Sequence, residues 1–299
     1  MTLTVSEFVG AAAGGALGAA LGALAGFALM GTIVIGVTLI AVALPNTDLV
    51  TGLAFGPVFG PHVLFAAGAA AAAYAAHRRA LESGRDIAKP LIGLHDTRIL
   101  WVGALFGVLG QLLARVFAEI PPLHTSTGAE VSTVDAIALS VVVTGLASGL
   151  LWGRNPLAER LPWLPWQHSA GAVLTLGAAG GAIAGSVFLA WPQDSRAMSG
   201  LFLYGVSALS LLVLVFGAAA PVTHHIVLPA AIGARAAASW NVPSSVVLLV
   251  AVVSGIAASL VAEAWARLVL ERSRVHLDPP AAAIAIMSTV LAVVQVVGS

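Results

Sequence analysis

The sequence predicts an all-α, polytopic integral membrane protein with about ten transmembrane helices. Of its 299 residues, 59% are hydrophobic and only 9% are charged, whereas an average soluble domain carries about 25% charged residues. Runs of roughly 20 apolar residues, the length at which a helix crosses a bilayer, recur along the whole chain. A third observation, a repeat of three stretches in the same order, predicts two inverted five-helix halves with paired broken helices.

The apolar segments can be placed in chain order. Residues 11–44 could form one long tilted helix or two helices, and we expect two that meet near Gly31. The next segment, 52–76, is interrupted, and a polar stretch, 77–96, follows it. Seven further helices are expected over residues 97–118, 134–152, 169–191, 200–220, 222–238, 244–265 and 279–297.

The basic residues predict the orientation in the membrane. Three short loops hold ten of the 13 Lys and Arg residues and, with ten spans, fall on one side. The positive-inside rule assigns that side to the cytoplasm of a plasma-membrane protein and both termini to the outside. No cleavable signal is expected, because the N-terminus carries Glu7 and no basic region. The ten residues are Arg78, Arg79, Arg85, Lys89, Arg98, Arg154, Arg160, Arg267, Arg272 and Arg274.

Composition and motifs disfavour several classes of protein. Basic and acidic residues balance at 13 each, and no basic face with interleaved aromatic residues suggests nucleic-acid binding. Cysteine is absent, which excludes disulfides and thiolate metal sites. The chain has no HExxH motif, P-loop or GxSxG elbow, so we expect no metal, no cofactor and no enzyme activity.

The segment 52–76 is the leading candidate for a site. Gly60 and Pro61 close a run of paired glycines and prolines, and a helix is expected to start near His62. A backbone break at membrane depth is tolerated only where protein or a water-filled cavity satisfies the freed polar groups. The interruption therefore marks this stretch as a candidate site.

An internal repeat gives this segment a partner. If each half, 1–155 and 156–299, holds five spans, the second half enters the membrane inverted, and such halves are typical of secondary transporters with a site between them. The second broken segment is PVTHHIVLPAA, which contains His224. The matched stretches are HVLFAAGAAAAAYAA from His62 and HIVLPAAIGARAAAS from His225, GVLGQLLARVFAE from Gly107 and GIAASLVAEAWAR from Gly255, and VDAIALS around Asp135 and LDPPAAA around Asp278.

One string supports this reading through a resemblance. FGPVFGPHVLFAAGAAAAAYAA, with GRDIAKPL shortly after it, resembles an uncharacterised family of multi-pass membrane proteins of actinobacteria and halophilic archaea that are loosely labelled permeases. The resemblance covers the first half best. It implies a permease-like membrane protein but carries no substrate and no functional residues.

Ionisable residues within apolar spans are functional hypotheses by default. We expect His62, His224 and His225, with Gly60 and Pro61, to bind the solute, because two facing helix starts would suit a small anion. This arrangement resembles the facing half-helices of sulfate-permease and nucleobase carriers. For His62 the alternative is a helix cap near the membrane interface. For His224 and His225 the alternative is a loop on the cytoplasmic side that would be solvated.

The carboxylates and charge pairs have two interpretations each. Asp135 and Asp278 begin spans, where they either cap a helix or couple a proton or sodium ion. Two pairs spaced i,i+4, Arg115 with Glu119 and Glu263 with Arg267, are expected to be structural.

These residues predict a secondary transporter or channel-like permease for a small anionic solute. A membrane-embedded enzyme, metal-dependent or lipid-modifying, and a non-transporting scaffold are the alternatives, and a homo-oligomer is left open. The bilayer and the solute are the partners that the sequence implies.

Overall fold

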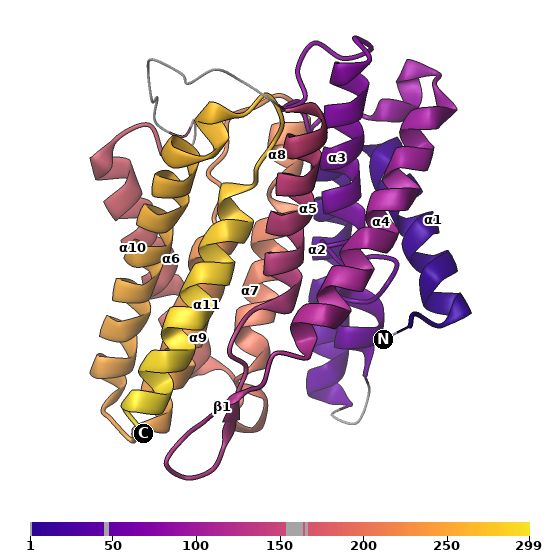
Figure 1. Ribbon diagram of the computed structural model, residues 1–299. Helices are drawn as coiled ribbons and strands as arrows, with labels where there is room; N and C mark the ends of the chain where they lie inside the picture. Colours follow the sequence, from indigo (N-terminus) through magenta and orange to yellow (C-terminus); the bar gives the residue numbers. More distant parts are fainter. Residues whose placement is uncertain (1, 45–47, 154–163, 165–166) are drawn as a thin grey trace.

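The computed structural model is a helical bundle and describes residues 2–44, 48–153, 164 and 167–299 (Figure 1). The first half contains α1 (Val5–Leu21), α2 (Ala23–Ala43), the π-helical turn η1 (Val50–Ala54), α3 (Leu64–His77), the 3-10 turn η2 (Leu91–Leu94), α4 (Thr97–Ala118), strands β1 (Leu123–His124) and β2 (Glu130–Val131), and α5 (Ala136–Trp152). The second contains α6 (Ala170–Ala190), the 3-10 turn η3 (Gln193–Ser195), α7 (Met198–Leu209), α8 (Leu212–Val215), α9 (His224–Ser239), α10 (Ser244–Leu268), the 3-10 turn η4 (Leu270–Arg272) and α11 (Pro279–Val297).

The predicted all-α class is confirmed for the described residues, apart from the short pair of β1 and β2. Among the described residues, six helical segments are long and apolar enough to cross a membrane: α2, α4, α6, α11, α7 continued by α8, and α10 continued to Arg272. Helices α1, α3 and α5 are apolar but shorter. Large apolar side chains such as Trp101, Leu105, Leu150 and Leu249 are exposed on the outer surface. Lipid would cover such a surface, while small Ala and Gly residues allow the helices to pack closely inside.

The predicted helix boundaries agree closely with most of the observed ones. Helices α4 and α11 coincide with the expected residues 97–118 and 279–297. The run 11–44 does hold two helices, but they meet at Gly22, so the expected junction near Gly31 is wrong. Gly22 has a φ of 85°, and a Cβ there would lie 2.7 Å from the Lys89 carbonyl oxygen, so the sharp turn requires glycine.

The helices of each half pack in the same pattern. In the first half α1, α3 and α4 contact one another, and α5 packs on α3 and α4. In the second half α6, α9 and α10 contact one another, and α11 packs on α9 and α10. Between the halves, α2 packs on α7 and α5 on α11.

The described parts of the three basic loops meet at one end of the bundle. Arg85 pairs with Glu271 at 2.6 Å, and Gly84 forms an isolated bridge with Val275. The Arg274 N–H donates to the Gly153 carbonyl at 3.3 Å. The start of α4 and the end of α10 therefore lie at the same end. Arg154, Arg160 and the expected boundary at 155 lie outside the described residues.

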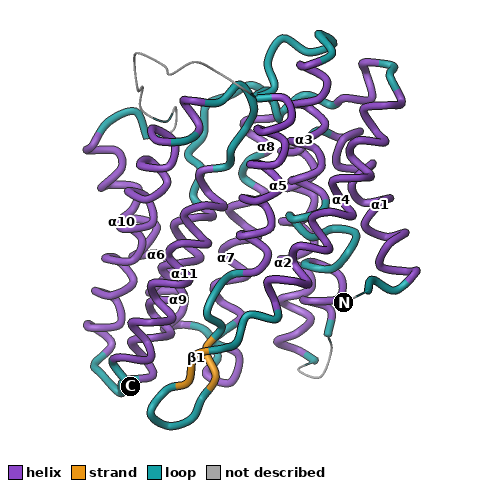
Figure 2. The backbone as a smooth tube through the Cα atoms, viewed as in Figure 1, coloured by secondary structure: helices purple, strands orange, loops and turns teal. Residues whose placement is uncertain are grey.

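Both expected breaks are present. Residues 55–63 between η1 and α3 are not regular helix, and α3 starts at Leu64, two residues after the expected His62. Residues 216–223 separate α8 from α9, which begins at His224. The antiparallel pair of β1 and β2 projects from the end where the C-terminus lies, and irregular segments run between the helices (Figure 2).

Candidate functional site

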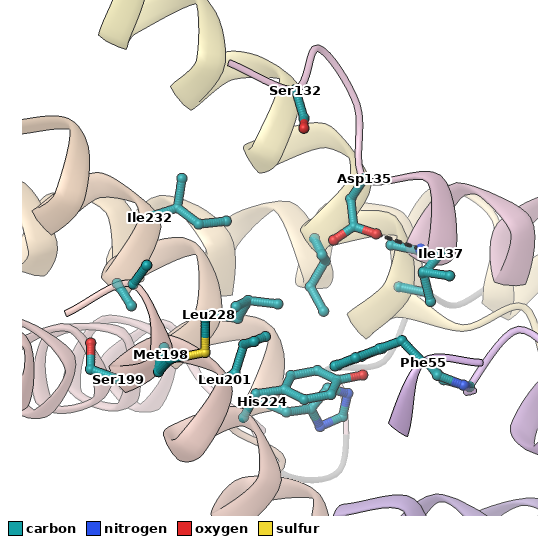
Figure 3. Close-up of a pocket in the computed structure, with 18 of the residues that line it drawn as sticks. Phe55, Ser132, Asp135, Ile137, Met198, Ser199, Leu201, His224, Leu228 and Ile232 are labelled. Atoms are coloured by element: carbon teal, nitrogen blue, oxygen red, sulfur yellow. Dashed lines mark hydrogen bonds between the residues drawn. The ribbon is translucent and has the colours of Figure 1, made fainter. Parts of the chain in front are cut away.

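A cavity of about 580 Å³ lies between the two halves of the bundle. Its walls come from α2, η1, α3 and α5 of the first half and from α6, α7, α9 and α11 of the second. The polar and charged lining residues are Thr51, Ser132, Asp135, Arg196, Ser199, Tyr204, His224, Arg235 and Asp278. Most of the remaining wall is apolar, so the cavity offers a few polar groups within a hydrophobic surface (Figure 3).

Two carboxylates, one from each half, line this cavity. Asp135 accepts a hydrogen bond from the Ala138 N–H at 2.8 Å and caps α5, as Figure 3 shows. Asp278 accepts from the Ala281 N–H, also at 2.8 Å, and caps α11. The capping interpretation is therefore confirmed. Because both residues also face the cavity, capping and a role in binding are compatible here.

The two caps differ in one partner. His276 Nε2 lies 2.9 Å from the Asp278 carboxylate. For Asp135, within the described chain, the hydrogen bond to Ala138 comes from the backbone of its own helix. Asp278 therefore has a side-chain hydrogen-bond partner in addition to its backbone donor, whereas Asp135 has only backbone donors among the described residues.

The helix breaks contribute His224 and Pro61 to the wall. The His224 ring is 94% buried and lies 4.8 Å from the Phe27 ring and 5.8 Å from the Tyr204 ring, measured between centroids. Its Nδ1 has no hydrogen-bond partner among the described residues. A buried imidazole nitrogen without a partner is costly, so His224 lowers stability at a position where its ring also lines the cavity.

His62 and His225 do not line the cavity, although the residues before them in the chain, Pro61 and His224, do. The His62 Nε2 instead makes a 2.7 Å hydrogen bond with Gln111 of α4. A Cβ on Gly60 would lie 2.4 Å from the His62 ring, so the glycine makes room for this imidazole. The predicted pairing of His62 with His225 as joint solute ligands does not match this geometry.

His225 is buried without any hydrogen bond to either ring nitrogen in the described chain. The residue that aligns with Gln111 is Ser259, whose hydroxyl is instead bonded by the Gln167 amide at 2.7 Å. The exchange of Gln for Ser explains why His62 has a side-chain partner and His225 has none.

Of the two predicted i,i+4 pairs, one is present. Arg267 donates to Glu263 at 2.8 Å. Arg115 pairs with Glu7 of α1 rather than with Glu119, so the prediction for the first pair is wrong. The tight packing of α1 on α4 brings Glu7 to the guanidinium, and a sequence interval within one helix could not reveal that contact.

Arg235 is the residue of the site that sequence reasoning missed. It lies on α9, lines the cavity, and has no hydrogen-bond or ion-pair partner in the described part of the chain. An arginine inside the apolar segment 222–238 was the available signal, because charged residues at membrane depth mark functional sites.

A second cavity of about 540 Å³ adjoins the first. It lies between the loop that precedes α5 and one face of α11, and both cavities share Ser132, Asp135, Ile232 and Arg235. Among the described residues, no group of three or more His, Asp and Glu side chains could hold a metal ion.

Comparison with known proteins identifies the family of the chain. The profile of a family of unknown function, DUF7973, matches residues 1–159 and 153–299. The chain belongs to this family. No curated protein and no solved structure matches it. For this DUF7973 member, function must therefore be argued from the cavity and its side chains.

Proposed function

We propose that the protein is a secondary transporter for a small anionic solute, built from two inverted five-helix repeats with the binding site between them. One observation carries the proposal: matched positions of the two halves line a single cavity that holds one carboxylate from each half. Inverted repeats with a site at their interface are a recurrent plan of secondary transporters.

The closest helix contacts support the repeat. A Cβ on Gly107 would lie 2.3 Å from the Ala11 carbonyl oxygen and 2.8 Å from the Gly15 Cα. A Cβ on Gly255, its sequence match, would lie 2.5 Å from the Gly177 carbonyl oxygen and 2.9 Å from the Gly181 Cα. The crossing of α1 with α4 thus has the same geometry as that of α6 with α10. The two ranges of the family match also divide the chain near the proposed boundary.

The helix directions support the inversion. Helix α4 starts at the end of the bundle where α10 finishes, because Arg85 pairs with Glu271 there. The two matched helices therefore run in opposite directions. Helices α5 and α11 also run oppositely in Figure 1.

The cavity wall follows the same correspondence. Residues one helical turn apart on α5 and α11 face the cavity from the two sides. Residues from the end of the first break and from the start of α9 face it as well. The matched lining pairs are Pro61 and His224, Phe65 and Leu228, Asp135 and Asp278, Ala138 and Ala281, and Val141 and Ile284.

The side chains suit a coupled carrier. His224 and the start of α9 provide donors for an anion, since a helix N-terminus carries partial positive charge. Asp135 and Asp278 can take up or release a coupling cation or proton as the solute binds. The basic loops are assigned to the cytoplasm and both termini to the outside by the positive-inside rule.

Flux measurements test the proposal. The purified protein is reconstituted into liposomes containing a pH indicator, and inward gradients of chloride, sulfate, phosphate and short monocarboxylates are imposed in turn. We expect one anion class to enter several-fold faster than in protein-free liposomes, with a pH change that D135N and D278N abolish. D96N is the matched control, because Asp96 also caps a helix, α4, but does not line the cavity.

Each outcome separates the possibilities. If no anion and no proton moves, the transporter proposal fails and the membrane-enzyme and scaffold alternatives take precedence. If D96N abolishes flux as completely as D135N and D278N, loss of the charge of any capping carboxylate disables the protein, and the two cavity carboxylates have no specific coupling role.

A further inference from the structure

We infer that the solute is an amphipathic organic acid whose anionic group binds Arg235 and whose apolar body lies along the apolar wall of the cavity. This inference rests on the proposed function and specifies its substrate class. It depends on the one free cation of the described cavity wall and on the chemistry of the wall around it.

The two arginines of the wall differ in availability. Arg196 donates to the carbonyl oxygens of Trp191 and Leu189 and lies over the Phe188 ring at 5.7 Å. Arg235 makes no such contact with any described residue and lines both adjoining cavities. A guanidinium presents a planar set of donors that matches a carboxylate in two parallel hydrogen bonds. Arg235 is therefore the group on this wall best placed to hold an acid.

The acidic groups that share these cavities are Asp135, Asp278 and Glu130. Asp135 and Asp278 accept backbone hydrogen bonds at the positive ends of α5 and α11, which offset part of their charge. None of the three forms an ion pair with Arg235 in the described chain. A positive group thus faces the cavity without a protein counter-ion.

The apolar part of the wall argues against an inorganic ion. Phe27, Phe55 and Tyr204 form a contiguous aromatic cluster with ring centroids 5.8 to 6.0 Å apart, and Leu201 and Leu228 lie beside it. Stripping water from a small ion in such surroundings is costly when few donors replace it. Cavities of 300–1,000 Å³ with apolar walls and few polar groups are typical sites for organic ligands.

Calorimetric binding in detergent tests the ligand class separately from transport. The probes are butyrate, hexanoate, octanoate and benzoate, the neutral amides of the same acids, and sulfate. We expect the acids to bind more tightly as their apolar part grows, up to about fourfold per methylene. We expect the amides and sulfate to bind at least about tenfold more weakly. R235Q should lower the affinity for the acids about 10- to 100-fold, which is the range for a lost charged hydrogen bond. R235K should restore part of that affinity. R98Q, which lies outside the cavity, should leave the affinity unchanged.

The two proposals fail differently. Equal affinity for sulfate and the acids, no saturable binding of any acid, or unchanged affinity in R235Q would overturn the ligand class. Acid binding that depends on Arg235 without flux of any acid would leave the class in place and refute the transporter. Flux of sulfate without binding of the acids would support the transporter and refute the ligand class.

A second, independent observation concerns the loops that precede α5 and α11, which hold corresponding places in the two halves but differ in packing. The loop before α11 lies on α5: Cβ atoms on Gly145 and Gly149 would be 3.5 to 3.7 Å from the Leu277 side chain, and the His276 N–H donates to the Gly84 carbonyl. The matching loop before α5 faces Ser288 and Ala292 of α11, which align with those glycines, across the second cavity.

We propose that these two loops are the alternating gates of the carrier. The gate before α11 is closed and the gate before α5 is open. Transport would close residues 132–134 onto α11 and lift residues 275–277 from α5. A symmetric carrier needs two such states of similar energy, and inverted repeats exchange their conformations to provide them.

Cysteine cross-linking tests the gates, because the chain contains no cysteine. The pair G149C/V275C should cross-link readily in the resting protein, because a Cβ on Gly149 would be in van der Waals contact with the Val275 side chain, at 3.6 Å. The pair S132C/A292C should cross-link only during turnover. Each cross-link should block flux and reduction should restore it. Both pairs forming together in the resting protein, or full flux through either cross-linked form, would refute the gates.

Discussion

Gly31 of α2 and Gly205 of α7 make reciprocal contacts. A Cβ on Gly31 would lie 2.8 Å from the Gly205 carbonyl oxygen and 2.9 Å from the Leu209 N atom. A Cβ on Gly205 would lie 2.8 Å from the Gly31 carbonyl oxygen and 3.1 Å from the Ile35 N atom. Residues that contact each other in this exchanged way lie on a local two-fold axis. The contact supports a two-fold axis that relates the proposed repeats and passes between α2 and α7.

This crossing predicts a matched pair of destabilising substitutions. G31A and G205A should each lower stability by about 1–3 kcal/mol, because the added methyl meets backbone atoms that cannot rotate away. G36A, on α2 but with no atom within 4 Å of its Cβ, should be neutral or slightly stabilising, since alanine favours a helix. Thermal unfolding in detergent measures all three, and equal midpoints for G31A and G36A would contradict the close contact.

Replacing the two buried histidines with leucine should affect stability differently. H62L should lower stability by about 1–3 kcal/mol, because the buried Gln111 loses its partner. H225L removes a buried ring with no partner and should leave stability unchanged or higher. Unfolding midpoints test both variants. A large loss in H225L would mean that this imidazole has a partner in solution, and loss of flux without loss of stability would assign it a functional role.

The positions of most helices could be predicted from the sequence, because long apolar runs mark them. The location of the α1–α2 junction could not, since Gly22 and Gly31 lie in the same apolar run. What distinguishes them is tertiary: Lys89 packs on Gly22, and α7 packs on Gly31. An apolar run contains no polar residue that would mark a turn.

The candidate site was predicted in part. Asp135, Asp278, Pro61 and His224 all line the cavity, and they were found because polar groups and breaks are rare in apolar spans. His62, which precedes α3, does not line the cavity, because its ring lies beside Gly60 and bonds to Gln111.

Buried charge provides a third prediction, at Glu263. Its side chain is 94% buried and accepts from Arg267 and, at 3.3 Å, from the Leu164 N–H. E263A should lower stability by about 1–3 kcal/mol, because the Leu164 N–H and the partly exposed Arg267 guanidinium lose this acceptor. E119A, on an exposed residue, should change stability by less than about 0.5 kcal/mol. Chemical denaturation of the two variants provides the measurement, and similar losses would show that Glu119 also has a structural partner.

The ion pair between Arg85 and Glu271 provides the last prediction, because it joins two loops at the closed gate. Its side chains are 34% and 17% exposed, so breaking it should cost only about 1 kcal/mol and shift the unfolding midpoint little. The same small energy, applied to a two-state gate, changes the open population about fivefold. In a V275C background, E271R should therefore raise the labelling rate by a membrane-impermeant thiol reagent several-fold. The charge swap R85E/E271R should restore slow labelling, because the pair reforms with reversed polarity. Slow labelling in E271R alone would mean that the packing of residues 275–277 on α5, not the ion pair, keeps this end closed.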